Sequence, residues 1–244
     1  MRIKFLGHAA VEVLADSGVK ILFDPYFVGC EYLITGGTIS HEQITEPYDI
    51  IAISHEHPDH NTIASIPGNP ELVHGMEIRG KGKINVQGID FWSIGCYHDH
   101  KQGTLLGGNS IICCEVDGVK IGHSGDIGHI PTEEQLDEIK KYGMDVFLLC
   151  IGLLQKQGER YEEFVIDTEA KMMNGIWEVM KPIAHCLIPI HYRSAKCDFR
   201  FITLDEFIKG KANVRYGYAS DMHLFPQFFQ FFPEPMILVL PPAL

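Results

Sequence analysis

The sequence lacks the features of a membrane or secreted protein. It contains no run of 18 apolar residues, so no segment is long enough for a transmembrane helix. Residues Met1–His8 have a strand-like pattern without the apolar stretch and cleavage site of a signal peptide. The seven cysteines are odd in number and most lie in apolar runs, which favours reduced core thiols over a disulfide framework. We therefore expect a cytoplasmic protein without a membrane partner.

The chain is also short of positive charge. Its 20 Lys and Arg residues face 32 Asp and Glu, so the formal net charge is −12. Nucleic-acid binding depends on clustered Lys and Arg, and we therefore expect no nucleic-acid partner. No internal repeat, low-complexity tract or linker divides the 244 residues, of which 45% are apolar. This composition predicts one globular domain over residues 1–244.

Short apolar and β-branched runs dominate the first half of the chain and predict β-strands. The predicted strands are Ile3–Leu6, Val11–Leu14, Val19–Phe23, Asp49–Ile53, Glu71–His74, Ile84–Val86, Phe91–Cys96, Ser110–Val116 and Val119–His123. Asp117-Gly118, between the last two, is a typical two-residue hairpin turn. It predicts a β-hairpin that brings His123 towards Asp126.

The second half predicts two main helices, each followed by a strand. The first helix begins at Thr132, which has capping-box spacing to Gln135, and ends near Gly143. The second begins near residue 167 or 168 and ends at Met180, before a proline. The strands that follow them are Asp145–Cys150 and Ala184–Ile190. Many strands followed by alternating helix and strand predict an α/β fold in which outer helices cover two sheets.

Two further segments have local signals. We expect a short helix over Thr62–Ile66, ended by Pro67-Gly68. Met236–Leu240, near the C-terminus, reads as a final strand that closes the second sheet. The Phe-rich tail that contains it is alternatively an apolar surface for homo-oligomer formation.

The richest chemical motif is Ser54-His55-Glu56-His57-Pro58-Asp59-His60. It follows the predicted buried strand Asp49–Ile53, and α/β folds place their chemistry at such strand ends. His55 and His57 point the same way on an extended segment and can chelate one ion. Asp59 and His60 follow a turn and can face a second ion beside the first. Imidazole nitrogens and carboxylate oxygens suit a divalent transition metal.

Three later strand ends carry further metal-binding residue types. Phe91–Cys96 runs into His98 and His100, and spacing alone does not choose between these two. Asp126 lies among small residues after the hairpin, where glycine lets the backbone approach closely and lets the carboxylate bridge two ions. The last strand ends at His191. Each residue alone is a weak signal, but together with the first motif they predict a metal centre.

This pattern resembles the metallo-β-lactamase superfamily. The resemblance rests on His55-x-His57-x-Asp59-His60, on Gly125-Asp126, on His191 and on the early strand end Phe23-Asp24-Pro25. Within the superfamily the chain is similar to compact hydrolases that include the ascorbate-6-phosphate lactonase-like group. The segments that carry this finer likeness are Tyr97-His98-Asp99, Gly107-Gly108-Asn109, His123–His129 and Pro189–Tyr192. The resemblance implies an αββα four-layer sandwich, with two mixed β-sheets flanked by helices.

The resemblance also implies a particular ligand set and chooses His98 over His100. One ion is expected on His55, His57 and His98, the other on Asp59, His60 and His191, with Asp126 bridging and Asp24 orienting a ligand imidazole. The cofactor is then two divalent ions, zinc or manganese first, with nickel and iron as alternatives. The expected nucleophile is a metal-bound hydroxide. Asp59 is expected to orient this nucleophile and to shuttle its proton.

The substrate prediction is a small anionic ester, lactone or phosphoester. Lys101 and Arg193 lie close in sequence to His98 and His191, and such cations can hold a phosphate or carboxylate. An ordinary solvated basic loop is the alternative. His129 is predicted to contact substrate or else to stabilise a turn. His8 ends the first strand and is expected near the site without being a ligand.

Three other functions compete with this hydrolase. The first is a phosphodiesterase or nuclease on the same fold, which the acidic net charge disfavours. The second is a diiron redox protein, but the resemblance then implies Glu where this chain has His57, and no flavin domain is attached. The third is a catalytically inert metal-binding or scaffold protein, against which the intact ligand set argues.

Overall fold

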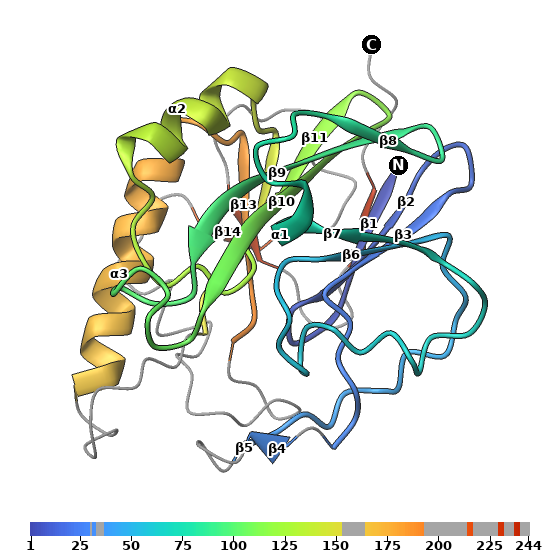
Figure 1. The fold of residues 1–244 in the computed structure, drawn as a ribbon, viewed down its shortest axis with the longest axis horizontal. Coiled ribbons are helices and arrows are strands. Elements are labelled where there is room, and N and C mark those ends of the chain that lie inside the picture. Colours follow the sequence, from blue (N-terminus) through green and yellow to red (C-terminus); the bar gives the residue numbers. More distant parts are fainter. Residues whose placement is uncertain are drawn as a thin grey trace.

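The computed structural model describes residues 1–29, 31–32, 37–152, 164–192, 214–216, 229–231 and 237–239. Two six-stranded sheets form its centre (Figure 1). The N-terminal sheet has the strand order β16-β1-β2-β3-β6-β7. Its strands are β1 (Arg2–Gly7), β2 (Ala10–Leu14), β3 (Lys20–Phe23), β6 (Ile50–Ile53), β7 (Glu71–His74) and β16 (Ile237–Val239). The sheet is mixed, because β3, β6 and β7 are parallel neighbours and the other pairings are antiparallel.

The C-terminal sheet has the order β13-β12-β11-β10-β9-β8 and is also mixed. Its strands are β8 (Ile84–Val86), β9 (Ile89–Tyr97), β10 (Gly108–Val116), β11 (Val119–His123), β12 (Val146–Cys150) and β13 (Cys186–Ile190). β11, β12 and β13 run parallel, whereas β8 to β11 form antiparallel pairs. The β10–β11 pairing confirms the hairpin predicted from Asp117-Gly118.

The remaining elements are short strands and helices. Two-stranded sheets are formed by β4 (Glu31–Tyr32) with β5 (Gly37–Thr38) and by β14 (Val214–Tyr216) with β15 (Phe229–Phe231). The helices are α1 (Gly75–Ile78), α2 (Glu133–Tyr142) and α3 (Phe164–Met180). None of the helices in these described ranges has the length and apolar character needed to cross a bilayer.

One apolar layer lies between the two sheets. In β1, Ile3 and Phe5 are buried while Arg2 and Lys4 are half-exposed. Side chains alternate between the two faces of a strand, so one face of β1 points into the core. Opposite them lie apolar side chains of the C-terminal sheet, among them Phe91. β12 is buried at every position, because its second face is covered as well.

Different structures cover the outer faces of the two sheets. The helices α2 and α3 cover the C-terminal sheet at the left of Figure 1. Trp177 and Met173 of α3 belong to a second core cluster with side chains of this sheet. On the N-terminal sheet, Tyr26, Ile44 and Tyr48 lie over the outer face, and they belong to loop segments. The two mixed sheets with outer helices confirm the predicted α/β class.

Most predicted elements are present, with boundaries that move by a few residues. The capping box of Thr132 and Gln135 is formed, and α2 ends at Gly143 as expected. The predicted helix over Thr62–Ile66 is wrong: this segment contains only a turn, in which the N–H of Ile66 donates to the carbonyl of Ile63, and the following Pro67 disfavours helical backbone before it. The short α1 was not predicted.

The last strand is also placed differently from the prediction. We expected Met236–Leu240 to close the second sheet, but β16 pairs with β1 at the edge of the N-terminal sheet. The strand itself could be predicted from its apolar residues. Its partner strand could not, because a short apolar run carries no information about which sheet it joins.

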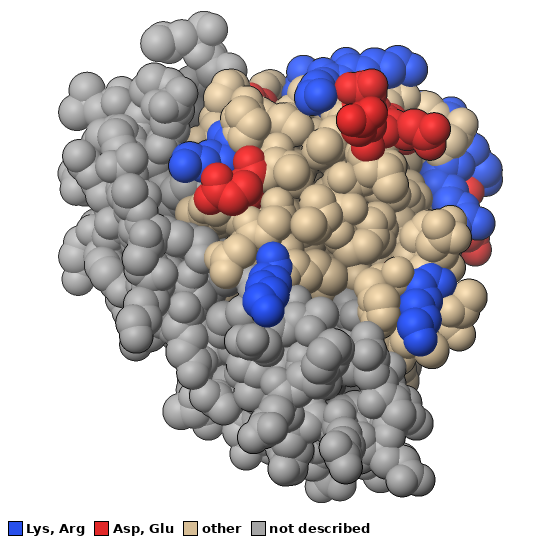
Figure 2. Space-filling model, turned by 90° about the vertical axis from the view of Figure 1, so that its left-hand side faces the viewer, with Lys and Arg blue, Asp and Glu red and all other residues tan. Residues whose placement is uncertain are grey.

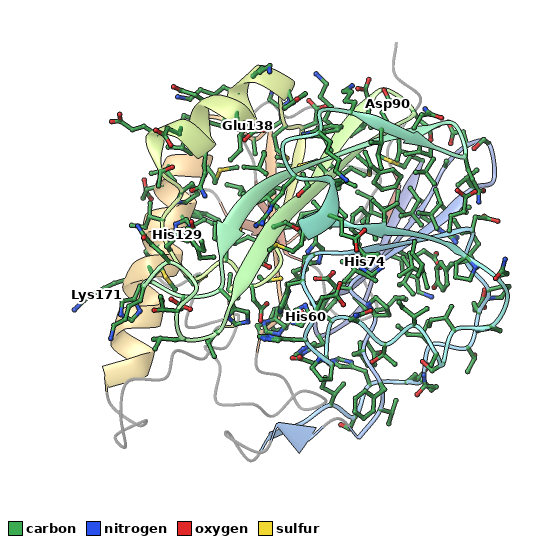
Figure 3. The ribbon with its side chains drawn as sticks, viewed as in Figure 1. His60, His74, Asp90, His129, Glu138 and Lys171 are labelled. Atoms are coloured by element: carbon green, nitrogen blue, oxygen red, sulfur yellow. The ribbon has the colours of Figure 1, made fainter. Side chains whose placement is uncertain are left out.

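The fold brings several strand ends to one end of the molecule. β3 and β6 are parallel, so Phe23 and Ile53 finish at the same edge of the N-terminal sheet. β11, β12 and β13 are parallel as well, so they finish together in the C-terminal sheet. In Figure 3, His60 lies at this lower end, whereas Asp90 and Glu138 lie at the opposite end. The residues after these strands can therefore form one site.

Candidate metal centre

The segment after β6 is a compact turn that carries four of the predicted ligands. The backbone N–H of His60 donates to the carbonyl of His57 at 2.9 Å. Nε2 of His55 and Nδ1 of His57 lie 3.1 Å apart, so both imidazoles point to one place. His55, Asp59 and His60 are buried, and His57 is half-buried.

One cluster of donor atoms consists of His55, His57 and His98, with ligand atoms all within 4.8 Å of one another. His98 follows the last residue of β9, and its ring centroid lies 5.0 Å from that of His55 and 4.7 Å from that of His57. His98 is buried, whereas His100 is exposed. The structure therefore brings His98, not His100, to the motif after β6.

A second cluster consists of His8, Asp59, His60 and His191, again within 4.8 Å. His60 lies between the clusters, since its ring centroid is 4.5 Å from that of His55 and 5.2 Å from that of His191. His191 follows β13 and arrives from the other sheet. The two donor groups therefore share one buried space between the sheet ends.

Asp126 lies between the two groups. Its Oδ2 is 3.2 Å from Nε2 of His98 and 3.3 Å from Nε2 of His60, while its Oδ1 is 3.7 Å from Nδ1 of His191. One carboxylate thus faces a member of the first group and two members of the second. Asp126 is therefore within reach of both donor groups.

Several buried donor atoms of this centre have no hydrogen-bond partner among the described residues. They are Asp59 Oδ1, His60 Nε2, His98 Nδ1, His98 Nε2 and Asp126 Oδ1. A buried polar atom without a partner costs about 1–3 kcal/mol, so native proteins rarely leave several together. All five are atoms through which His and Asp bind divalent ions. The residues present therefore fit a divalent-metal site.

Asp24, at the end of β3, holds the turn after β6 in place. Its Oδ1 accepts the backbone N–H of Ser54 at 2.7 Å, and its Oδ2 accepts the Ser54 hydroxyl at 2.6 Å. Oδ2 also lies 3.0 Å from Nδ1 of His60, which must be the donor because an ionised carboxylate only accepts. His60 consequently presents Nε2 to the cluster. Asp24 is thus placed to orient this imidazole, and its role beside a metal stays a prediction.

Asp126 is held by close packing around small residues. Its backbone N–H donates to Oδ1 of Asn109 at 3.2 Å, and the Asn109 amide donates to the carbonyl of Ser124 at 2.8 Å. A Cβ on Gly125 would lie 2.3 Å from Asn109 Oδ1, and one on Gly128 would lie 2.1 Å from the carbonyl oxygen of His98. No side chain fits at either position, so the glycines are required for this approach.

The electrostatics of the cluster favour metal-binding protonation states at most positions. Burial lowers the pKa of His55 and of His191 well below the ordinary 6.5, and it lowers that of His57 as well. Burial raises the pKa of Asp126, but His191 and His60 outweigh it and hold that pKa well below its ordinary value. The first three are therefore neutral imidazoles at pH 7 and Asp126 is a carboxylate.

His60 is the exception. Burial lowers its pKa, but the carboxylates of Asp126 and Asp59 outweigh burial and raise it well above 6.5. His60 therefore holds a proton at neutral pH in the metal-free protein. A metal that binds Nε2 has to displace this proton.

The predicted substrate residues are placed less centrally. Nε2 of His129 accepts the backbone N–H of Tyr97 at 3.2 Å, and its Nδ1 lies 2.9 Å from the carbonyl oxygen of Ile130. Both nitrogens thus bond backbone groups, as in the turn-stabilising alternative. Lys101 is exposed in the loop after His98. Arg193 lies outside the described residues, and substrate contact stays a prediction for all three.

Two residues of this centre go beyond what the sequence indicated. His8 was expected near the site and not as a ligand, and it lies within the second donor group, with Nε2 3.0 Å from Asp59 Oδ2. The signal was present, since His8 follows an apolar strand just as His191 does. No role was predicted for Ser54, although its hydroxyl donates to Asp24 Oδ2 and lies 2.9 Å from His55 Nδ1. A serine carries no comparable signal by itself.

The fold and this donor arrangement define the class of protein. Residues 2–181 match the family described as the beta-lactamase superfamily domain, and the chain belongs to that superfamily. The predicted family is thereby confirmed.

Individual relatives give a narrower comparison. A UPF0173 metal-dependent hydrolase of Thermococcus onnurineus is 28% identical, over 80% of this chain and 85% of the relative. One from Methanospirillum hungatei is 29% identical, over 80% and 84%. A solved structure of a metallo-β-lactamase superfamily protein from Thermotoga maritima has a TM-score of 0.64 at 20% identity, covering 95% of this chain and 97% of that one. This last likeness concerns the fold alone.

Proposed function

We propose that this protein is a metal-dependent hydrolase that uses two divalent ions to cleave a small anionic ester, lactone or phosphoester. The observation that carries the proposal is the pair of adjacent His/Asp donor groups whose buried atoms lack partners among the described residues. Relatives named metal-dependent hydrolases, aligned over four-fifths of the chain, support it.

The two donor groups divide the ions between them. His55, His57 and His98 hold one ion, and Asp59, His60 and His191 hold the other. Asp126 would be the ligand shared by the two ions, because its carboxylate lies within 3.3 Å of nitrogens from both groups. Imidazole and carboxylate ligands suit zinc or manganese, and nickel or iron are the alternatives.

The protein's own groups then orient the reaction. The bound ions supply Lewis acidity, which lowers the pKa of water and polarises the scissile carbonyl or phosphoryl group. Asp59 Oδ1 has no partner among the described residues and would bind the second ion, which would place this carboxylate beside the attacking water to orient it. Asp24 keeps His60 in position through Nδ1.

The proposed substrate class rests on the charge of the protein and of side chains near the predicted ligands. Lys101 and Arg193 flank the predicted ligands in sequence and are the proposed contacts for an anionic group, with His129 at the neighbouring turn. Among the described residues on the face drawn in Figure 2, acidic and basic side chains are interspersed. The net charge of −12 disfavours a nucleic-acid substrate. A lactonase-like activity on a small molecule is therefore favoured over a nuclease.

Metal analysis combined with a substrate panel tests this function. We expect about two divalent ions per chain and hydrolysis of anionic lactones or phosphoesters in preference to phosphodiesters. His57→Ala removes one imidazole of the first group and should lose both metal and activity. The matched control is His185→Ala, whose exposed imidazole bonds Asp145 away from the cluster, and it should retain both.

Three results would contradict the proposal. A wild-type protein that takes up no divalent metal under any condition overturns the metal centre itself. A protein that binds metal but hydrolyses nothing in the panel leaves an inert metal-binding protein as the better description. Preference for phosphodiesters, with salt-dependent binding of RNA or DNA, favours the nuclease alternative instead.

A further inference from the structure

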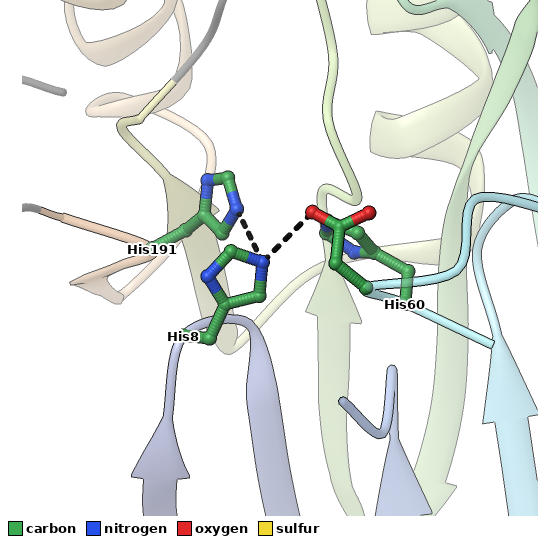
Figure 4. Close-up of side chains that lie close together, drawn as sticks. His8, His60 and His191 are labelled. Carbon is green, nitrogen blue, oxygen red and sulfur yellow. Dashed lines mark hydrogen bonds and ion pairs between the residues drawn. The ribbon is translucent and has the colours of Figure 1, made fainter. Parts of the chain in front are cut away.

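His8 lies outside the seven predicted ligands, yet its imidazole stands between two of them. Nε2 of His8 is 3.0 Å from Oδ2 of Asp59 and 3.0 Å from Nε2 of His191 (Figure 4). All three side chains are buried. This contact joins the end of β1, the turn after β6 and the end of β13.

The backbone supports the same contact. The N–H of His191 donates to the carbonyl of His8 at 2.7 Å, so residues 183 positions apart are bonded through both backbone and side chain. His8 and His191 both have positive φ, +52° and +58°, which L-residues seldom adopt. Gly7 precedes the turn with φ +116°, and a Cβ there would lie 2.4 Å from the ring of His41. The chain is therefore turned sharply at the place that puts His8 against Asp59.

Asp59, His60 and His191, the predicted ligands in the second donor group, share one arrangement. Each has one atom held by a neighbouring group and another directed to the cluster. Nδ1 of His60 is held by Asp24, and Nδ1 of His191 is held by the carbonyl of Gly152. A carbonyl only accepts, so His191 carries its proton on Nδ1 and offers a lone pair at Nε2. Oδ2 of Asp59 is held by His8, while Oδ1 has no partner among the described residues.

We propose that His8 is a positioning residue for the second metal, acting through Asp59 and His191. Its Nε2–H donates to Asp59 Oδ2, which turns Oδ1 towards the cluster, and its ring packs against His191 with centroids 4.1 Å apart. A nitrogen that donates its proton in this way is not itself a ligand. This inference rests on the proposed function, because it assumes that Asp59, His60 and His191 hold an ion.

A cobalt titration of the metal-free protein tests this role. The wild type should bind two ions in separable steps that can be followed by absorbance. His8→Asn suits the positive φ but shortens the donor, and we expect it to weaken the second step about 10- to 100-fold while leaving the first unchanged. His41→Asn is the matched control, a buried histidine that packs on the same turn at Gly7, and it should keep both steps. Thermal unfolding of each metal-free variant checks that the fold is intact.

The outcomes separate this inference from the proposed function. If the wild type binds no cobalt, the proposed function fails. If the wild type binds two ions and folded His8→Asn binds both with unchanged affinity, only the role of His8 is overturned. Complete loss of the second step, even at a hundredfold higher cobalt, overturns positioning in favour of direct ligation. If His8→Asn does not fold, His8→Gln is titrated by the same criteria.

Discussion

At the residue scale, the metal centre depends on which atom of each side chain is already occupied. Asp24 holds His60 through Nδ1, and Ser54 lies 2.9 Å from Nδ1 of His55. The opposite nitrogens, Nε2 in both cases, consequently face the cluster. Such bonds fix the ring orientation before any metal arrives, which lowers the cost of organising the site on binding.

The raised pKa of His60 makes a prediction about metal affinity. Below this pKa the metal-free protein carries a proton on His60, and binding must release it. Affinity should therefore rise about tenfold per pH unit as the pH approaches the raised pKa of His60 from below, and then level off. Calorimetry in two buffers of different ionisation heat measures the proton release, expected at about one per chain near pH 7. No proton release at that pH would mean that His60 is neutral before metal binds.

At the element scale, the loop after β9 is organised by Asp99. Oδ1 of this buried residue accepts the backbone N–H groups of Lys101 and Gly103, and Oδ2 accepts those of Leu105 and Leu106. Burial raises the pKa of Asp99, but these bonds outweigh it and lower that pKa. The loop starts directly after His98, so one carboxylate shapes the border of the first donor group.

Replacing Asp99 should weaken the protein. Asp99→Ala leaves the four loop N–H groups without their acceptor, and we expect a loss of about 1–3 kcal/mol in the free energy of unfolding. Because the pKa is lowered by folding, the stabilisation is present above the ordinary 3.8 and disappears as pH falls through the lower folded pKa. Denaturant unfolding at pH 7 measures the loss.

The control for this experiment is Asp137→Ala, an exposed carboxylate on α2 that pairs with Lys140. Its loss should stay within about 0.5 kcal/mol. Equal effects of the two variants would show that the bonds of Asp99 contribute no particular stability.

At the scale of the whole molecule, the first and last strands described, β1 and β16, pair in the N-terminal sheet. β16 pairs antiparallel with β1, with Arg2 opposite Val239 and Lys4 opposite Ile237. Without β16, β1 would be an edge strand with open hydrogen-bonding groups. One part of the apolar tail, β16, thus pairs within the same chain. Homo-oligomer formation through the Phe-rich segment stays a prediction.

Truncation tests this closing strand. A chain that ends at residue 235 lacks β16 and exposes the edge of β1, so we expect a lower melting temperature and concentration-dependent association. A chain that ends at residue 240 keeps β16 and serves as the control. Differential scanning calorimetry and light scattering compare the two. Identical melting and size for both truncations would show that the β16–β1 pairing does not stabilise the protein.

Local patterns were enough to predict much of this protein. Apolar runs and the Asp117-Gly118 turn indicated strands and a hairpin, and Thr132 with Gln135 indicated the start of α2, because each feature depends on neighbours within a few residues. The spacing of His55, His57, Asp59 and His60 indicated a metal site for the same reason. The local signal over residues 62–66 failed, because five residues that end at a proline form a single turn and are too few to sustain a helix by themselves.

Contacts between distant residues required the tertiary structure. The tertiary structure places β16 beside β1. It buries His98 while His100 is exposed. It also puts Asp126 between the two donor groups. The position of His8 against His191, 183 residues away, has the same origin. Periodicity and turn residues specify elements, because those interactions are short-range. The meeting of strand ends depends on how whole sheets pack, and no local pattern encodes it.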